Sequence, residues 1–194
     1  KLWGGRFAKG SSAAMDAFHS SISFDARLYK EDIEGSIAHA KMLARQGIVS
    51  TEDGEAIVSG LQKILEDIEA GEVEFRTDAE DIHMNVETLH IERIGEAGKR
   101  LHTARSRNDQ IALDMRMYMK ESIRSNLMER CPLDTALLDS AEAHLHPVMP
   151  GYPHLQKARP ITVAHQHLAY VEVFSRDMGR LRNCYERTNV MPLS

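Results

Sequence analysis

Apolar residues recur every three or four positions along most of this chain, which is the spacing of one buried face of an α-helix. The first clear stripe covers residues 33–43 and stops at Gly47. A second stripe covers residues 57–68 and stops at Gly71, and Ser50 ahead of it is a residue type that caps helix N-termini. The pattern therefore predicts two consecutive amphipathic helices in the first third of the chain.

The next region gives a weaker pattern. Residues 72–75, with the sequence EVEF, are the only strand-like fragment, and it is too short to matter for the fold. We expect Asp78 to cap a third helix whose apolar face lies on residues 82–89, and Gly95 to end that helix.

Two longer helices are predicted in the second half of the chain. One starts near Ile111, and we expect Pro132 to kink or break it, because an interior proline costs about 3 kcal/mol. The other has Pro160 at its first position, where proline is favoured, and its apolar residues step by three and four from residue 168 to residue 185. That stripe predicts a helix of about 25 residues, roughly 40 Å long at about 1.5 Å per residue.

Helices of this length are typical of an elongated bundle shared between subunits, rather than of a small compact domain. We therefore expect an all-α protein. A small helical N-terminal domain with an extended arm should cover residues 1–105, and the opening helices of a long bundle should cover residues 106–194.

Composition narrows the class of protein further. The 194 residues are 42% hydrophobic and 27% charged, which is ordinary for a globular protein, and a formal net charge of −5 gives no electrostatic basis for binding nucleic acid. The sequence has no run of about 18 apolar residues that would predict a membrane span, and the N-terminal KLWGGRF lacks the apolar core of a secretion signal. Cys131 and Cys184 have no CxxC spacing, so we expect a reducing, cytoplasmic location.

A block of polar residues precedes one of the long helices, in the segment HTARSRNDQ at residues 102–110. Ser106, Asn108 and Asp109 are all competent N-caps, and the free N–H groups at a helix start favour an anion. The two arginines of the segment could add bidentate donors to a carboxylate or a phosphate. The alternative is a solvated loop with an ordinary helix cap.

A second polar segment, MPGYPHLQKARP at residues 149–160, has its backbone restricted by prolines and a glycine. Tyr152, His154 and Gln156 can hydrogen-bond a small polar ligand, and His154 can exchange a proton near neutral pH. The alternative is a histidine satisfied by a backbone carbonyl, with Tyr152 and Gln156 as turn partners. The functional hypothesis requires this segment and residues 102–110 to meet in space.

A metal site on the third helix is a weaker hypothesis. His83, Glu87 and His90 lie at positions i, i+4 and i+7, so one helix face could present three metal ligands. The HExxH spacing is absent and no cysteine is near. We therefore prefer an ordinary polar helix face and expect no metal site.

Five motifs are more specific together than any one of them alone: LWGGRF, AEDIH, LHTARSRNDQ, MPGYPHLQKARPIT and NVMPL. In their order and spacing, the chain resembles the argininosuccinate lyase family, to which the lens δ-crystallins also belong, from Leu2 to Leu193. The resemblance is closer than that to the fumarase, aspartase or adenylosuccinate lyase branches, and SRNDQ with LWGGRF makes the distinction.

The resemblance implies β-elimination of argininosuccinate to arginine and fumarate, without a metal or an organic cofactor. It implies that His154 is the catalytic histidine, either in proton transfer or in orienting a partner. It also implies a homotetramer in which three subunits contribute to each active site. The positions that it places at the substrate are Ser21, Asp81, His83, Ser106, Arg107, Asn108, Pro153 and Gln156.

Three departures from the family pattern affect these expectations. Pro153 stands where the family has a threonine that contacts substrate, so a hydrogen bond worth about 1.5–3 kcal/mol is lost. Pro132 falls within a helix that the family keeps long, and the family's loop with the catalytic serine is not found in these 194 residues. We therefore expect the N-terminal part of an argininosuccinate lyase, inactive or nearly so by itself. The alternative is a catalytically inert structural or interaction protein of the crystallin kind.

A shortened bundle should also leave apolar side chains without partners. We expect the stripes on residues 115–123 and 168–185 to be exposed. Exposed apolar patches promote association, so the isolated chain should self-associate or dissolve poorly.

Overall fold

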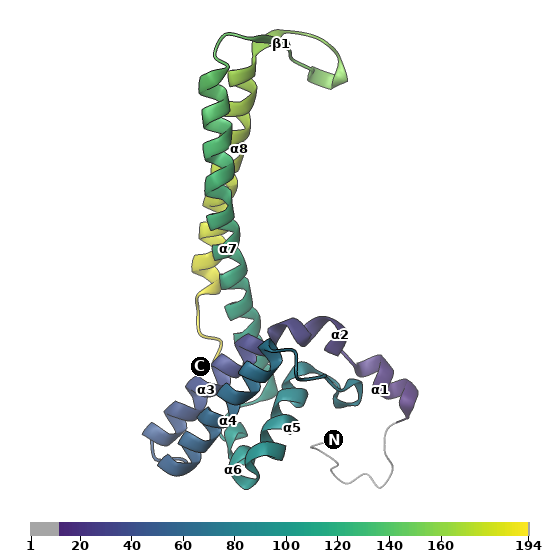
Figure 1. Ribbon diagram of the computed structural model, residues 1–194, viewed down its shortest axis with the longest axis vertical. Coiled ribbons are helices and arrows are strands. Elements are labelled where there is room, and N and C mark those ends of the chain that lie inside the picture. The colour runs from purple at the N-terminus through teal and green to yellow at the C-terminus, as the bar shows by residue number, and fades with distance from the viewer. Residues whose placement is uncertain (1–11, 194) are drawn as a thin grey trace. The chain divides into compact units, whose positions relative to one another are not determined.

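The computed structural model describes residues 12–193, and almost all of the regular structure in this range is helical (Figure 1). The predicted all-α class is therefore confirmed, while the LWGGRF motif lies outside the described residues. The described chain divides into two compact units. One contains the residues up to Tyr118 together with 192–193, and the other is Met119–Met191. The domain boundary expected between residues 105 and 106 stays a prediction.

Three helices form the core of the first unit: α3 (Tyr29–Arg45), α4 (Thr51–Glu69) and α5 (Ile82–Ile94). Burying one large apolar side chain contributes about 1.5–3 kcal/mol, so the apolar stripes hold these helices together. The fully buried side chains of the stripes include Ile33, Leu43, Ile57, Leu61, Ile64 and Ile82. The shorter elements are α1 (Ala13–His19), α2 (Ile22–Asp25), η1 (Ala26–Leu28), η2 (Thr77–Ala79), α6 (Glu96–Lys99) and η3 (Arg100–His102).

The predicted ends of the first two long helices are confirmed. Ser50 Oγ accepts a hydrogen bond from the Asp53 amide at 3.1 Å and so caps α4. Gly47 and Gly71 follow α3 and α4 with φ angles of +66° and +74°. These left-handed conformations favour glycine, because a Cβ atom would be strained there.

The cap predicted for the third helix is wrong. Asp78 lies in the turn η2, and its carboxylate accepts hydrogen bonds from Arg76 at 3.1 and 2.9 Å. Asp81 has the extended backbone of an N-cap instead, and its Oδ1 accepts from the Met84 amide at 2.6 Å. The residue that caps α5 is therefore Asp81, which directly precedes the helix. The EVEF fragment at residues 72–75 forms no strand in the described chain.

The second unit is a pair of helices joined by a hairpin (Figure 1). It contains the later part of α7 (Arg107–Ala143), the strands β1 (Val148–Pro150) and β2 (Pro160–Thr162), which pair antiparallel, and α8 (Val163–Thr188). The 26 residues of α8 confirm the predicted long helix. The periodicity does not predict the strands, because three residues are too few for an alternating pattern.

The prediction for Pro160 is wrong, and the chain does not break at Pro132, whereas the kink expected there stays a prediction. Pro160 belongs to β2, and α8 starts after Thr162, whose Oγ1 accepts from the His165 amide at 3.1 Å. A threonine cap nearer the helix therefore sets its start. Pro132 lies inside α7, which continues past it. Pro132 and Met128 are both exposed, so water can satisfy the carbonyl that loses its amide partner.

Polar and aromatic contacts join the two helices of the second unit. The Arg130 guanidinium lies 3.6 Å from the centroid of the Phe174 ring. The Lys120 ammonium donates to Asn189 Oδ1 at 2.6 Å and lies 5.6 Å from the centre of the Tyr185 ring. Because Lys120 is early in α7 while its partners are late in α8, the two helices run antiparallel.

The predicted exposure of the apolar stripes is only partly correct. Met119 and Leu168 are 41% and 43% exposed, as expected, but Ile123 is buried at 3%. None of the helices in residues 12–193 is long and apolar enough to cross a membrane. The expected self-association stays a prediction.

Candidate functional site

The start of α7 is built as a reciprocal cap. Ser106 Oγ accepts a hydrogen bond from the Asn108 amide at 3.2 Å, and the Asp109 carboxylate accepts one from the Ser106 amide at 2.8 Å. This arrangement satisfies backbone donors that a helix start leaves free. Ser106 and Asn108 are exposed. Their side chains are therefore accessible, and their predicted contact with substrate stays a prediction.

Arg107 is held by the protein itself. Its Nη2 donates to Glu87 Oε2 on α5 at 2.5 Å, and its Nη1 donates to Gln110 Oε1 at 2.7 Å. Both members of the Arg107–Glu87 ion pair are largely buried, with side chains 15% and 17% exposed. The Nε atom of Arg107 is buried without a hydrogen-bond partner among the described residues. A guanidinium has five N–H donors, so Nη1 and Nη2 each keep one beyond these two bonds.

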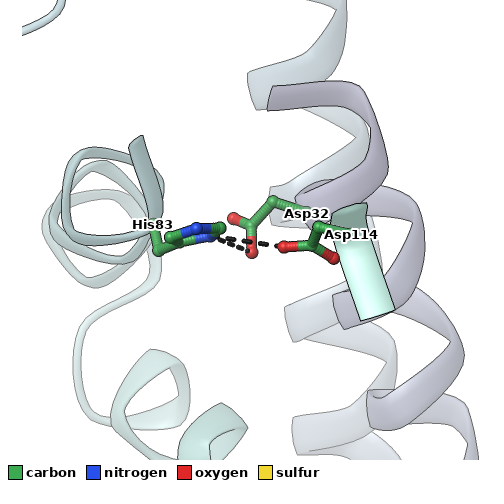
Figure 2. Close-up of side chains that lie close together, drawn as sticks. All are labelled: Asp32, His83 and Asp114. Atoms are coloured by element: carbon green, nitrogen blue, oxygen red, sulfur yellow. Dashed lines mark hydrogen bonds and ion pairs between the residues drawn. The ribbon is translucent and has the colours of Figure 1, made fainter. Parts of the chain in front are cut away.

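A second set of polar side chains lies where α3, α5 and α7 come together, and it consists of Asp32, His83 and Asp114 (Figure 2). His83 Nδ1 lies 3.1 Å from Asp32 Oδ1 and 3.3 Å from Asp114 Oδ2. His83 is 2% exposed and the two aspartates are 1% exposed each. Gln110 also donates to Asp32 Oδ1. The three side chains therefore form one buried His–Asp–Asp cluster.

The three residues of the cluster have pKa values that are shifted from their ordinary values in different directions. Burial alone would raise the pKa of Asp32, but the hydrogen bond and charge of His83 hold that pKa below its ordinary value. Burial, together with the Asp32 carboxylate, raises the pKa of Asp114 to about 8. Burial alone would lower the pKa of His83, but the two aspartates raise it. Near neutral pH, Asp32 is therefore ionised, Asp114 holds a proton, and His83 keeps its proton more readily than a free histidine.

Reasoning from the sequence missed Asp32 and Asp114. One signal was available for Asp32, because it is four residues from Ser36 and eight from Ala40, on the apolar face of a predicted helix. All three positions are buried. A carboxylate on a buried face needs a partner, so this position could have been singled out. Asp114 gives no such signal, because its partners come from other helices.

A pocket of about 500 Å³ lies beside the cluster, within the first unit. The resemblance places Ser21, Asp81 and His83 at the substrate, and all three line this pocket. Ser21 donates from its amide to the Glu80 carbonyl at 2.8 Å and from its hydroxyl to Asp25 at 2.5 Å. The remaining lining residues are Phe24, Asp25, Arg27, Leu28, Ile111, Met115 and Tyr118. Three of the predicted substrate positions are therefore neighbours in the fold.

The residues of the second polar segment lie in the hairpin loop of the second unit. Pro153, His154 and Gln156 are all exposed, and Pro153–Leu155 form the turn η4. His154 and Leu155 have φ angles of +53° and +61°, a left-handed backbone that is strained for residues other than glycine. No hydrogen bond of the described chain uses the His154 ring, so its predicted catalytic role stays a prediction.

The two polar segments lie in different units, one in residues up to Tyr118 and one in Met119–Met191. Their meeting around a ligand therefore also stays a prediction. Inside the loop, Gly151 donates to the Arg159 carbonyl at 2.7 Å, and a Cβ atom at Gly151 would lie 3.2 Å from that oxygen. This close approach of the two loop ends favours glycine, because with a Cβ atom the carbonyl would have to move by a few tenths of an ångström.

The three polar side chains on one face of α5, His83, Glu87 and His90, do not converge on a common point, because each has a partner of its own. His83 contacts the buried aspartates, His90 bonds through Nε2 to the Ile57 carbonyl at 3.1 Å, and Glu87 pairs with Arg107. A different set of atoms is spaced for a cation, because those of the His–Asp–Asp cluster lie within 4.8 Å of one another. The positive guanidinium of Arg105 acts on Asp32 there, which opposes a cation.

Comparison with known proteins adds a family to this geometry. The profile of a family described as lyase matches residues 5–194. The chain is 58% identical over 193 residues to argininosuccinate lyase from Heliobacterium mobile and 60% identical over 196 residues to that from Desulforamulus reducens. Each match covers all of this chain and 42% of the relative, so the chain spans about two fifths of the length of these relatives.

Solved structures share the fold. An EDDS lyase variant with bound fumarate superposes with a TM-score of 0.75 and 26% identity, covering 95% of this chain and 37% of that one. A fumarate lyase from Mesorhizobium sp. BNC1 matches with a TM-score of 0.67 and 20% identity, over 96% of this chain and 43% of that one. The all-α architecture is thus one that lyases of known structure also adopt.

Proposed function

This chain belongs to the lyase family, and on that premise we propose that it is the N-terminal part of an argininosuccinate lyase. The proposed reaction is a β-elimination that splits argininosuccinate into arginine and fumarate, without a metal or an organic cofactor. The observation that carries the proposal is the identity of 58–60% to argininosuccinate lyases, which extends over the whole chain. The EDDS lyase variant with bound fumarate, a structural neighbour, is consistent with fumarate as a product.

The chemistry sets requirements that this chain meets in part. A base must remove a proton from a carbon beside a carboxylate, and the charge that develops needs a dense set of donors. Asn108, Ser106 and the guanidinium of Arg107 are the donors proposed at the start of α7. An acid must then help the guanidinium nitrogen to leave. His154 is the residue proposed for proton transfer or for orienting the partner that performs it, with Gln156 beside it.

The proposal includes an assembly. Active sites that combine the start of α7 and the hairpin loop from different subunits of a homotetramer would bring the two polar segments together. The exposed His154, which has no side-chain hydrogen bond within residues 12–193, is consistent with a partner supplied by another subunit. The proposed location is the cytoplasm.

The test is fumarate release from argininosuccinate by the natural-length protein that carries this sequence, followed by the absorbance of the conjugated product. His154→Asn should lower kcat by about 10²–10⁴-fold, the range for loss of a general acid or base, and Asn108→Ala should raise KM. Asp139→Asn, an exposed change on α7, is the control and should leave both constants unchanged. The 194-residue chain alone should be inactive or nearly so. A natural-length protein that releases no fumarate would refute the proposal and favour an inert structural role.

A further inference from the structure

His83 belongs both to a buried polar cluster and to the lining of a pocket. It is the centre of the buried His–Asp–Asp cluster, and it also lines the pocket that contains Ser21 and Asp81. Asp32 and Asp114 both approach the same ring nitrogen, Nδ1. The nitrogen that remains for a molecule in the pocket is therefore Nε2, and no hydrogen bond within residues 12–193 uses it.

We infer that Asp32 and Asp114 are positioning residues, which fix the His83 ring through Nδ1 and make Nε2 an N–H donor to a carboxylate of the ligand in this pocket. The inference rests on the proposed function only for the identity of that ligand. Neither aspartate lines the pocket, so both would act through His83.

The geometry supports a fixed ring. A carboxylate on Nδ1 sets the orientation of a histidine ring and keeps a proton on Nδ1, so Nε2 becomes a donor when the ring carries both protons. Asp32 is itself held by Gln110, so the acceptor for Nδ1 is also fixed. The cluster comes from α3, α5 and α7 and is buried, which restricts the movement of all three side chains.

The charges around the ring favour its doubly protonated form, and Asp25 and Arg27 add one charge of each sign to the lining of the pocket. The groups that act on His83 are Asp32 on α3, Asp114 on α7 and Asp81 at the start of α5. Arg105, whose Nη1 donates to Ser36 at 3.0 Å, adds a positive charge near Asp32 and Asp114. With Asp32 ionised and Asp114 protonated, the ring can keep both of its protons near neutral pH, and a doubly protonated ring donates through both nitrogens.

The experiment measures KM and kcat for argininosuccinate from about pH 6 to pH 9 in the natural-length protein. In Asp32→Asn, the loss of the negative charge should shift the alkaline rise in KM to lower pH by about one unit, which is a tenfold change in KM on that limb. Asp114→Asn resembles the protonated acid. It should therefore leave KM at pH 7 near the wild-type value, and its KM should begin to rise at a lower pH than in the wild type, where ionisation of Asp114 near pH 8 helps His83 to keep its proton. His83→Gln should give a raised KM that no longer depends on pH in this range.

A purely structural role predicts a different result. It would lower activity by the same factor at every pH, as expected for a loss of folded protein. Asp67→Asn is the matched control, because it removes a partly buried acid of α4 that is paired with Lys63 of the same helix and Arg93 of α5. If Asp32→Asn does not fold, Asp114→Asn alone decides the question. Unchanged pH dependence of KM in the folded variants would overturn the inference.

Two further measurements distinguish a failure of the proposed function from a failure of the positioning role. If the wild-type protein releases no fumarate, the proposed function fails. The positioning role is then tested by the NMR titration of ¹³C-labelled His83, which should titrate at lower pH in Asp32→Asn than in the wild type. Zinc is added in a separate calorimetric arm. Stoichiometric zinc binding that Asp114→Asn abolishes would overturn the inference, because the cluster would then be a metal site.

Discussion

Arg107 Nη2 lies 2.5 Å from Glu87 Oε2, and this ion pair joins the first turn of α7 to α5. The arginine belongs to the polar segment at residues 102–110, which the sequence predicts as a candidate anion site. The glutamate belongs to the face of α5 that also has His83 and His90. Their ion pair therefore holds the polar segment at the start of α7 against this face of α5. Removing one partner would leave the other largely buried and without its charge partner.

Glu87→Gln should therefore destabilise the first unit. The amide can still accept a hydrogen bond, but the charge is lost, and we expect the free energy of unfolding to fall by about 2 kcal/mol. The measurement is urea unfolding followed by circular dichroism. Glu92→Gln is the control on the same helix, since Glu92 is exposed, and it should change stability by less than about 0.5 kcal/mol. Equal effects of the two variants would contradict the role of the ion pair.

Asp114 should make the stability of the folded chain decrease as the pH rises. Its folded pKa of about 8 lies above the ordinary 3.8, so the folded state holds a proton that the unfolded state releases between these values. His83, with a raised pKa, acts in the same direction above its ordinary 6.5. Asp32 has a lowered pKa and acts in the opposite direction, but only below its ordinary 3.8, in acid. Burial lowers the pKa values of His39, His90 and His102, which also act in the opposite direction but only up to their ordinary 6.5. The first two effects therefore dominate between about pH 7 and 8.

The measurement is urea unfolding at about pH 6, 7 and 8, with a loss of stability of up to about 1.4 kcal/mol per pH unit from Asp114. Asp114→Asn should flatten this slope, because an amide does not titrate. Asp139→Asn, exposed on the same helix, should retain it. A wild-type protein whose stability is constant over this range would show that Asp114 is ionised in the fold.

The sequence predicts local features of this fold well. The stripes that became α3 and α4, the Ser50 cap and the length of α8 each depend on residues close together in the chain, so periodicity and residue type are sufficient. The errors at Asp78 and Pro160 have one cause. In each case a competent cap lies two or three residues further on, and a count of favoured residue types does not choose between neighbouring caps.

The candidate site likewise contains residues that the sequence predicts and residues that it does not. Ser21, Asp81 and His83 could be grouped through the resemblance to a family, and the structure brings them to one pocket. The partners of His83 could not be found in that way. Asp32 and Asp114 are separated from it by 51 and 31 residues along the chain, which follows from their numbering. Only the packing of three helices brings such residues together, and no local pattern contains that information.

Pro132→Ala should stabilise the second unit. Proline is about 3 kcal/mol less favourable than alanine inside a helix, and α7 continues through this position. Because Pro132 is exposed, its replacement loses little packing, and a gain of about 1–3 kcal/mol is expected. The measurement is the midpoint of thermal unfolding. Leu133→Ala, at an exposed neighbouring position, should leave the midpoint nearly unchanged. No gain in Pro132→Ala would mean that the helix has adapted to the proline.

Leu155→Asn should also be stabilising. Leu155 has a φ angle of +61° and is 94% exposed, so it is strained without burying its side chain. Asparagine tolerates the left-handed region, and the gain should be about 1 kcal/mol. Leu138→Asn, at a 46% exposed position inside α7, is the control for the change in polarity and should be neutral or destabilising. A decrease in the unfolding midpoint of Leu155→Asn would show that the leucine is buried by another subunit.

Pro153→Thr should increase the affinity for argininosuccinate. Pro153 is exposed at the start of η4, beside His154, and it stands where the resemblance expects a threonine whose hydroxyl contacts substrate. Restoring a hydrogen bond to a charged group is worth about 1.5–3 kcal/mol, which corresponds to a decrease in Kd of about 10–100-fold. Calorimetric titration of the natural-length protein measures this change. Pro153→Ala is the matched control, because it removes the proline ring without adding a hydroxyl. Equal changes in the two variants would assign the effect to the backbone and would exclude the hydroxyl as a substrate contact.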